Sequence, residues 1–364
     1  MLPNAPKDVG RLSDVFVSAL GAIVGGESNR LKLPRVKSAG VVLIDGLGHA
    51  NLRDNLGYAS NLRKALNGRD IPSIRVEFPA TTAVSLTSLG TGMRSGSHGI
   101  AGYQVSNNQG QLVNMLNSWG GEIEPREWQP HQTIAETAAN LGVKTYFVGP
   151  KAYEGSGFTE VFMRGSIYVP ADSIEERAGK AAELLKQSGN LVYLYFPELD
   201  QAAHRFGVDS EQWRAALETV DSAIAVLTDS KGGVILTADH GIVDVQHSKH
   251  IYLDEIPGFS SAVSLTGGDP RVAYLYGDAE AIDSALEPLE AFILTTPAEL
   301  AARGWCLPFA GQARVPERIL LARGEVAFYD RRTAKAQSLK MIGQHGSIDD
   351  EEQRIPLIKL GAFA

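Results

Sequence analysis

The chain has 364 residues, of which 44% are hydrophobic and 21% charged, and its formal net charge is −8. That length is enough for one large α/β domain or two smaller ones, with a sizeable core. The negative charge argues against binding of a nucleic acid polymer, because surfaces for such polymers gather lysine and arginine. The single cysteine, Cys306, excludes an internal disulfide framework.

The first predicted element is the apolar segment VFVSALGAIVGG at residues 15–26, which has the composition of a signal-peptide core. Asp14 precedes it, positive residues are sparse around it, and no A-x-A cleavage site follows. Its apolar residues recur at helical spacing, which favours an amphipathic helix lying on the domain. We therefore expect a cytoplasmic protein, with export as the alternative. We expect no membrane span, because the sequence has no run of roughly 18 apolar residues.

The middle of the chain alternates β-branched apolar runs with helical patterns. Continuous apolar runs are typical of strands that are buried on both faces of a parallel sheet. Their alternation with helices predicts an α/β fold, in which a doubly wound, mostly parallel sheet is sandwiched by helices. The predicted strands are residues 39–46, 144–150, 190–200 and 232–241, and the predicted helices include residues 131–142, 173–189 and 209–229.

Three of these predicted strands end at an aspartate, namely Asp45, Asp200 and Asp239. In doubly wound sheets, ligands bind beyond the carboxyl ends of the strands. We therefore expect the three carboxylates to converge on one crevice.

The pattern changes between about residues 248 and 340. The segments DPRVAYLYGD at 269–278 and GEVAFYDRRT at 324–333 have the pattern of antiparallel strands, and a helical pattern lies between them. The segment RIPLIKLGAF at 354–363 is again strand-like, and we expect it to return to the main sheet. The sequence therefore predicts a single catalytic domain over residues 1–364, with a small α+β cap subdomain inserted at 248–340.

Histidines accompany the aspartates. Asp200 and His204 are four residues apart, so a helix that begins near Asp200 would place both on one face. His240 follows Asp239 directly, and His345 lies in the motif GQHGS. Each of these residues alone is more often structural than metal-binding. Together they suit Zn²⁺, with Mn²⁺ as the alternative, and two such ions roughly 4 Å apart would clamp an in-line displacement at phosphorus.

Five motifs occur in order between residue 41 and the C-terminal region: VVLIDGLG, FPATTAVSLTSLGTGMRSGSHGI, YFPELDQAAHRFG, LTADHGIVDV and GQHGS. Each motif is weak alone, but in this order they resemble the type I phosphodiesterase/nucleotide pyrophosphatase branch of the alkaline phosphatase superfamily. The resemblance implies an alkaline phosphatase-like fold and two divalent metal ions. It also implies hydrolysis of a small phosphate diester or pyrophosphate, and we expect substrates of the nucleotide type.

The same resemblance implies the roles of individual residues. In that family, a threonine nine residues before a T-G pair attacks phosphorus, and counting back from Thr91 gives Thr82 rather than Thr81. The implied mechanism passes through a phosphothreonine intermediate on Thr82. A helix that begins there would point backbone N–H groups at the phosphoryl oxygens. One metal would be held by Asp45, Thr82, Asp239 and His240, and the other by Asp200, His204 and His345.

Ser85 departs from the family pattern, because nucleotide pyrophosphatases of this branch usually carry an asparagine three residues after the nucleophile. Its hydroxyl can still donate one hydrogen bond to a phosphoryl oxygen, so Ser85 is a substrate-binding candidate. His98 is expected to support the helix rather than bind metal. The aromatic residues Tyr103, Trp119 and Trp128 could stack on a nucleobase, but we expect them in the core or at the rim rather than in the site.

The main alternative is a phosphomonoesterase, or a phosphonoacetate-hydrolase-like enzyme with the same threonine and metals. Monoester enzymes usually add a cation for the extra phosphate charge, and Lys151 and Arg164 are the candidates. A sulfatase would need a C-x-P-x-R motif, which the segment CLPFA around Cys306 lacks. A non-catalytic binding protein is least favoured, because every matched position carries a competent residue. The sequence does not predict the oligomeric state.

Overall fold

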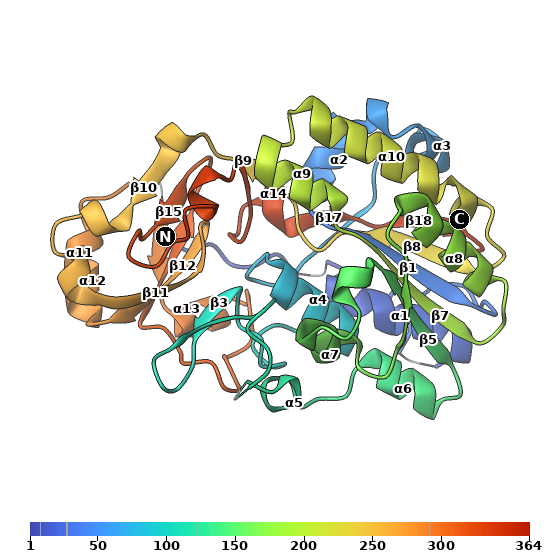
Figure 1. Ribbon diagram of the computed structural model, residues 1–364, viewed down its shortest axis with the longest axis horizontal. Helices are drawn as coiled ribbons and strands as arrows, with labels where there is room; N and C mark the ends of the chain where they lie inside the picture. Colours follow the sequence, from blue (N-terminus) through green and yellow to red (C-terminus); the bar gives the residue numbers. More distant parts are fainter. Residues whose placement is uncertain (8, 27, 122, 291) are drawn as a thin grey trace.

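The computed structural model describes residues 1–364 apart from residues 8, 27, 122 and 291. The chain forms a larger lobe around a six-stranded sheet and a smaller lobe around a four-stranded sheet (Figure 1). The N-terminal residues lie beside the smaller lobe, where the indole of Trp305 donates to the carbonyl of Pro3. Among the described residues, no helix combines the length and the apolar character needed to cross a membrane.

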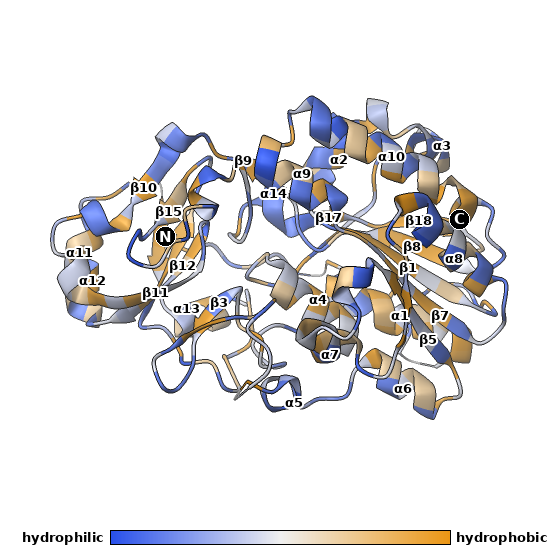
Figure 2. Cartoon of the chain, viewed as in Figure 1, coloured by the Kyte–Doolittle hydropathy of each residue, from blue (hydrophilic) through white to orange (hydrophobic). Residues whose placement is uncertain are grey.

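The six-stranded sheet has the strand order β18-β8-β1-β7-β5-β6. Its neighbours pair in parallel except at one edge, where β18 runs antiparallel to β8. Every residue of β1, β7 and β8 is buried, as their continuous apolar runs predicted, and Figure 2 shows these strands mainly in hydrophobic colours. The strands are β1 (Ala39–Ile44), β5 (Lys144–Gly149), β6 (Ile167–Pro170), β7 (Asn190–Phe196), β8 (Gly233–Thr237) and β18 (Ile358–Gly361).

Helices cover both faces of this sheet, which confirms the predicted doubly wound α/β architecture (Figure 1). On one side lie α1 (Val15–Val24), α4 (Thr82–Thr91), α6 (Ile134–Asn140) and α7 (Gly157–Met163). On the other side lie α3 (Ser60–Leu66), α8 (Ile174–Leu185), α9 (Glu198–Phe206) and α10 (Glu211–Thr228).

Helix α1 corrects one expectation from the sequence. The predicted helix is present, but it is not an amphipathic helix on the surface, because seven of its ten residues are buried. One side of α1 packs on β1, while α4 and α6 contact it as well. A helix enclosed in this way can be apolar on most of its circumference, which explains why the segment resembles a signal-peptide core.

The smaller lobe contains an antiparallel sheet with the order β11-β12-β14-β13. The strand predicted at 324–333 is not part of it, because residues 327–329 pair in parallel with residues 250–252 in a separate two-stranded sheet. The smaller lobe has its own hydrophobic core, which includes Phe259, Leu275 and Leu320. After this lobe the chain returns to the main sheet through β18, as expected. The limits 248–340 of a separate cap remain a prediction. The strands are β11 (Val263–Asp269), β12 (Val272–Gly277), β13 (Phe292–Thr295) and β14 (Arg318–Ala322), and the helices are α11 (Phe259–Ala262), α12 (Ala279–Leu286) and α13 (Pro297–Ala302).

Short elements complete the chain. The helices among them are α2 (His49–Asp54), α5 (Pro125–Trp128) and α14 (Asp350–Gln353), with 3-10 turns at Leu12–Asp14, Leu56–Tyr58, Lys151–Tyr153, His247–Lys249, Leu253–Glu255 and Ser338–Lys340. The strands are β2 (Ser73–Arg75), β3 (Gln104–Ser106), β4 (Leu112–Asn114), β9 (Val243–Asp244), β10 (His250–Tyr252), β15 (Ala327–Tyr329), β16 (Gly343–Gln344) and β17 (Arg354–Pro356).

Candidate metal centre and active site

Three neighbouring strands of the main sheet deliver aspartates to one edge. Asp45 directly follows β1, Asp239 follows β8, and Asp200 lies in the first turn of α9, just after β7. Strand β1 lies between the other two, so the three carboxylates meet, as the sequence predicted. The N–H of Gly46 donates to Oδ1 of Asp239 at 3.1 Å. Gly46 adopts a φ of 72°, which a glycine reaches without strain.

Three histidines complete the cluster. The ring of His240 stacks on that of His345, with 3.6 Å between the centroids and 15° between the planes. Nδ1 of His345 lies 2.9 Å from the carbonyl of Ala80. Nδ1 of His204 lies 2.7 Å from the carbonyl of Gly343. Each of these carbonyls can accept a hydrogen bond from Nδ1–H, which leaves Nε2 as the ring atom with a free electron pair, the usual arrangement of a metal-binding histidine.

The ligand-type atoms of these side chains form two overlapping groups. Those of Asp200, His204 and His345 all lie within 4.8 Å of one another, and so do those of Asp45, Asp200 and His240. Asp200 therefore belongs to both groups. Asp239 adjoins the second group, with 3.5 Å between its Oδ2 and Nε2 of His240. The structure thus brings together all six aspartates and histidines that the sequence nominated.

The electrostatics of this cluster fit bound cations. Burial, and then the neighbouring carboxylates, raise the pKa of Asp45 well above its usual value and that of Asp239 to about 7. Among the described residues, Oδ1 of Asp45, Oδ1 of Asp200 and Oδ2 of Asp239 are buried without a hydrogen-bond partner. Burial also lowers the pKa of His240 to about 3, which keeps its imidazole neutral. Burial likewise lowers the pKa of His345, whereas that of His204, despite its burial, is raised to about 9 by the Asp200 carboxylate. Buried carboxylates with free oxygens beside the imidazoles of His240 and His345 form a donor set suited to divalent metal ions.

Thr82 lies at the edge of this cluster, with Oγ1 3.2 Å from Nε2 of His240. It is the first residue of α4, and Thr81 is the N-cap, in an extended conformation. Ser85 lies one turn further along, fully buried, with no partner for its Oγ among the residues that the structure describes. Its substrate-binding role remains a prediction. His98 packs behind the helix as expected, with Nε2 3.0 Å from Oγ of Ser88.

Two cavities meet at Thr82. The larger, of about 460 Å³, is lined mainly by aromatic and apolar residues, including Trp119, Tyr153 and Phe158. The smaller, of about 280 Å³, opens towards the smaller lobe and is lined by Asp200, His204 and His345 together with Tyr103 and Asp269.

The two cavities correct the expectation for the aromatic residues. Tyr103 and Trp119 line cavities that also contain Thr82, whereas Trp128 is buried and lines neither of them. Asn117 and Asp269 also line these cavities and were not nominated from the sequence. Neither Asn117 nor Asp269 lies in a motif with recognisable spacing, so no local signal in the sequence could have revealed these two residues.

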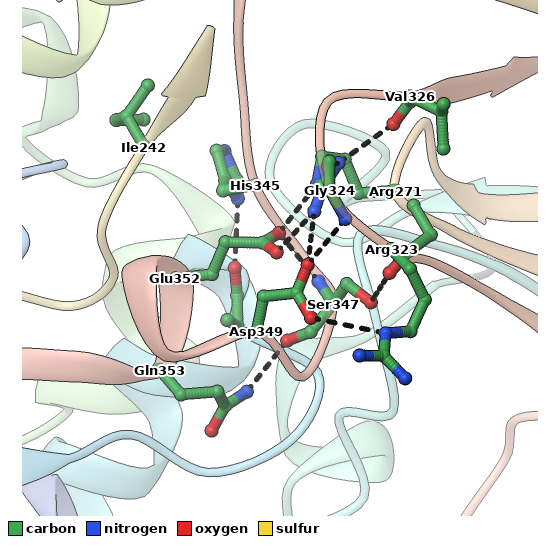
Figure 3. Close-up of polar contacts among 12 residues, drawn as sticks. Ile242, Arg271, Arg323, Gly324, Val326, His345, Ser347, Asp349, Glu352 and Gln353 are labelled. Carbon is green, nitrogen blue, oxygen red and sulfur yellow. Dashed lines mark hydrogen bonds and ion pairs between the residues drawn. The ribbon is translucent and has the colours of Figure 1, made fainter. Parts of the chain in front are cut away.

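The loop that carries His345 is held by a buried ion pair from the smaller lobe (Figure 3). Arg271 donates to Glu352 through two hydrogen bonds, Nε to Oε1 at 3.0 Å and Nη2 to Oε2 at 2.7 Å. The Glu352 carboxylate also accepts from the N–H of Ser347 at 2.8 Å. Its backbone carbonyl accepts from the N–H of Gly241, beside His240. Glu352 therefore anchors the backbone next to two histidines of the cluster.

Comparison with known proteins decides the family. The family model for type I phosphodiesterase/nucleotide pyrophosphatase matches residues 40–347, which contain every residue of the cluster. The chain belongs to this family. The family comprises hydrolases, and its match confirms the resemblance drawn from the five motifs.

Two curated relatives are only distantly similar to this member of the phosphodiesterase family. An uncharacterized pyrophosphatase/phosphodiesterase of Schizosaccharomyces pombe is 24% identical over 68% of the chain and 53% of its own length. Ectonucleotide pyrophosphatase/phosphodiesterase family member 7 of Mus musculus is 28% identical over 30% of the chain and 28% of its own length. The chain thus spans about half or less of the length of these curated relatives.

Among solved structures, murine ectonucleotide pyrophosphatase/phosphodiesterase 5 matches with a TM-score of 0.68 and 19% identity, over 89% of this chain and 88% of its own. An inactive variant of the same murine protein, in complex with AMP, matches with a TM-score of 0.66 and 19% identity, over the same shares of the two chains. These likenesses confirm the predicted fold.

Proposed function

We propose that the protein is a metal-dependent phosphodiesterase of the nucleotide pyrophosphatase type, with Thr82 as its nucleophile. The observation that carries this proposal is the position of the Thr82 hydroxyl. It lies 3.2 Å from Nε2 of His240, beside two groups of buried aspartate and histidine ligands, where two cavities meet. Family membership supports the same chemistry.

Two divalent ions would be held by the residues that the sequence nominated: Asp45, Thr82, Asp239 and His240 for one, and Asp200, His204 and His345 for the other. When bound, such ions lower the pKa of a coordinated hydroxyl and stabilise negative charge on phosphoryl oxygens. Zn²⁺ is favoured by the mixture of imidazole and carboxylate donors, and Mn²⁺ is the alternative.

The residues of the chain supply the rest of the mechanism. Oγ1 of Thr82 loses its proton to solvent and attacks phosphorus, and the bond from phosphorus to the leaving oxygen breaks as that oxygen takes up a proton. Thr82 begins α4, so the free N–H groups of the first helical turn can donate to phosphoryl oxygens. Water then cleaves the phosphothreonine bond and restores the Thr82 hydroxyl.

The larger cavity supports a substrate with one planar, aromatic arm. Its lining combines Trp119, Tyr153 and Phe158 with the polar side chain of Asn117. Aromatic walls favour stacking with a ring, and an amide adds hydrogen bonds to it. The AMP in complex with the similar murine protein suggests a nucleotide as that arm.

The charge of both cavities favours a diester over a monoester. Among the described residues that line them, none is a lysine or an arginine. Arg164, one of the two candidate cations, is buried and donates to Glu136 and to two backbone carbonyls. Lys151, the other candidate, is exposed and lines neither cavity. A monoester or phosphonoacetate would lack the additional cation that its second negative charge calls for.

The test compares p-nitrophenyl-TMP with p-nitrophenyl phosphate, using protein supplied with Zn²⁺ or Mn²⁺. We expect the diester to be preferred, and Thr82→Ala to lower turnover by on the order of 10³-fold or more. Thr87→Ala is the control, since Thr87 lies on the same helix, only donates to the carbonyl of Ala83 and lines neither cavity. Preference for the monoester, or loss of turnover in Thr81→Ala but not in Thr82→Ala, would contradict the proposal.

A further inference from the structure

The cavity of about 280 Å³ on the side of the smaller lobe has a wall that the proposed chemistry does not use. One side of this cavity holds Thr82 and the ligands Asp200, His204 and His345. The opposite wall comes from the smaller lobe and from the segment that follows it: Asp269 and Pro270 at the turn between β11 and β12, and Ser338, Met341 and Gln344.

Asp269 is the acidic group of this wall, and burial raises its pKa to about 8. Its Oδ2 is buried and has no hydrogen-bond partner among the described residues. No ion pair between Asp269 and a lysine or arginine occurs in the part of the chain that the structure describes. A Cβ added to Gly346 would lie 3.5 Å from the Cβ of Asp269. The Asp269 side chain therefore begins beside the loop that carries His345. A carboxylate oxygen removed from solvent without a donor is costly, unless a ligand supplies the donor.

The rest of the wall carries no positive charge. Leu116 and Met341 give it apolar surface, while lysine and arginine are missing from the described residues that line it. Lys335 lines an adjoining cavity of about 100 Å³ that shares Tyr103 and Asp269, but it does not line this one. A leaving group that bears another phosphate would therefore face a carboxylate without a compensating cation, which is unfavourable.

We propose that this cavity is a leaving-group site and that Asp269 selects an alcohol bearing a hydrogen-bond donor, an ammonium or a hydroxyl, over a leaving phosphate. The inference rests on the proposed function. Because Thr82 lines both cavities, one ester arm of phosphorus would occupy the aromatic cavity and the other this one. Oγ1 of Thr82 loses its proton to solvent and bonds to phosphorus as the bond to the alcohol oxygen breaks, and that oxygen takes a proton from solvent. Asp269 holds the distal donor and transfers no proton.

The experiment uses four TMP derivatives that differ in the leaving group: the 2-aminoethyl, 2-hydroxyethyl and ethyl esters, and TDP, whose leaving group is phosphate. TMP release by the full chain with Zn²⁺ or Mn²⁺ gives kcat/KM for each, in the wild type, in Asp269→Asn and in Glu287→Gln. Glu287 is an exposed carboxylate of the same lobe that lines neither cavity. The ratio of kcat/KM between two esters is compared between variants, because the intrinsic difference in leaving ability between the two alcohols is the same in every variant.

We expect the ratio of kcat/KM for the 2-aminoethyl ester to that for the ethyl ester to fall about tenfold in Asp269→Asn, the loss of one charge-assisted hydrogen bond. Glu287→Gln should leave the ratio unchanged. The same ratio is measured for the 2-hydroxyethyl ester. If it falls less than the ratio for the 2-aminoethyl ester, the ammonium is the better donor for Asp269, and if it falls more, the hydroxyl is. An unchanged ratio in Asp269→Asn, or a wild-type preference for TDP, would overturn the inference while leaving the proposed function standing.

Binding gives a second readout that needs no turnover. The Kd of the 2-aminoethyl and ethyl esters is measured by calorimetry on Thr82→Ala and on Thr82→Ala with Asp269→Asn. Tighter binding of the 2-aminoethyl ester that depends on Asp269 would support the leaving-group site even if the wild type cleaved no ester. That result would contradict the proposed function alone. Equal binding of the two esters, together with absent turnover, would overturn both.

Discussion

Arg271 and Glu352 form an ion pair in which both side chains are fully buried, and this pair joins the smaller lobe to the loop that carries His345 (Figure 3). Arg271 lies in the turn between β11 and β12 and also donates to the carbonyls of Gly324 and Val326. Glu352 accepts from the N–H of Ser347. The pair therefore helps to fix the loop that positions His345, a nominated metal ligand, through the backbone of that loop rather than through the His345 ring.

Removing one member of this pair should be strongly destabilising. Arg271→Met or Glu352→Gln leaves the other group buried without its partner, which typically costs about 3–5 kcal/mol. The double variant, Arg271→Met with Glu352→Gln, should lose less stability than the sum of the losses in the two single variants. Urea unfolding measures these free energies. The exposed pair Arg318–Asp283 is the control, because breaking it should cost no more than about 1 kcal/mol. Equal losses at both pairs would contradict this account.

Metal content should follow the two ligand groups. Elemental analysis of protein loaded with Zn²⁺ should find about two ions per chain. His204→Ala removes a ligand from one group only, whereas Asp200→Asn affects both, so Asp200→Asn should lose more metal. Chelation should also lower the free energy of unfolding, since an ion at 100 times its Kd adds about 2.7 kcal/mol. A wild-type chain without bound Zn²⁺ would refute the proposed metal centre.

Glu77 should make stability depend on pH. Burial raises its pKa to about 7, although Ser13 donates to Oε1 at 2.6 Å. The folded chain therefore keeps a proton that the unfolded chain releases above about pH 4.5, so this stabilisation is complete below pH 4.5 and lost as the pH rises to about 7.

As the pH rises from 5.5 to 8, the ionisation of Glu77 should lower the free energy of unfolding by about 2 kcal/mol. Glu77→Gln should remove that part of the pH dependence and keep the hydrogen bond to Ser13. Urea unfolding of both proteins at the two pH values gives the difference. The same pH slope in both proteins would show that Glu77 does not titrate in this range.

Gly241 should tolerate no side chain. A Cβ at this position would lie 1.9 Å from the carbonyl oxygen of Glu351, so Gly241→Ala must displace either the loop after His240 or α14. We expect a loss of about 1–3 kcal/mol and, because a shift of about 1 Å at a catalytic group is costly, roughly 10²-fold in turnover.

Gly179→Ala is the matched control for Gly241→Ala. Gly179 lies within α8, and a Cβ there would meet nothing within 4 Å. Alanine should stabilise this helix by about 0.5–1 kcal/mol and leave turnover unchanged. Wild-type turnover in Gly241→Ala would show that the loop moves without disturbing His240.

Local patterns in the sequence determined the main sheet and the chemical elements of the site. Apolar runs that end at Asp45, Asp200 and Asp239 predict parallel strands whose carboxyl ends share one edge, and the geometry of the doubly wound sheet then brings the aspartates together. Spacing was enough to place His204 one helical turn from Asp200. The resemblance to the family's motifs nominated Thr82, whose role as nucleophile remains a proposal.

Only the tertiary structure decided which residues surround that cluster. Tyr103, Trp119 and Asp269 reach the cavities from separate loops and from the smaller lobe, and Arg271 meets Glu352 across 81 positions of the chain. Helix α1 is buried because α4 and α6 cover it, which its own periodicity cannot show. Contacts between distant segments depend on how whole elements pack, and a local pattern carries no information about the partner that will cover it.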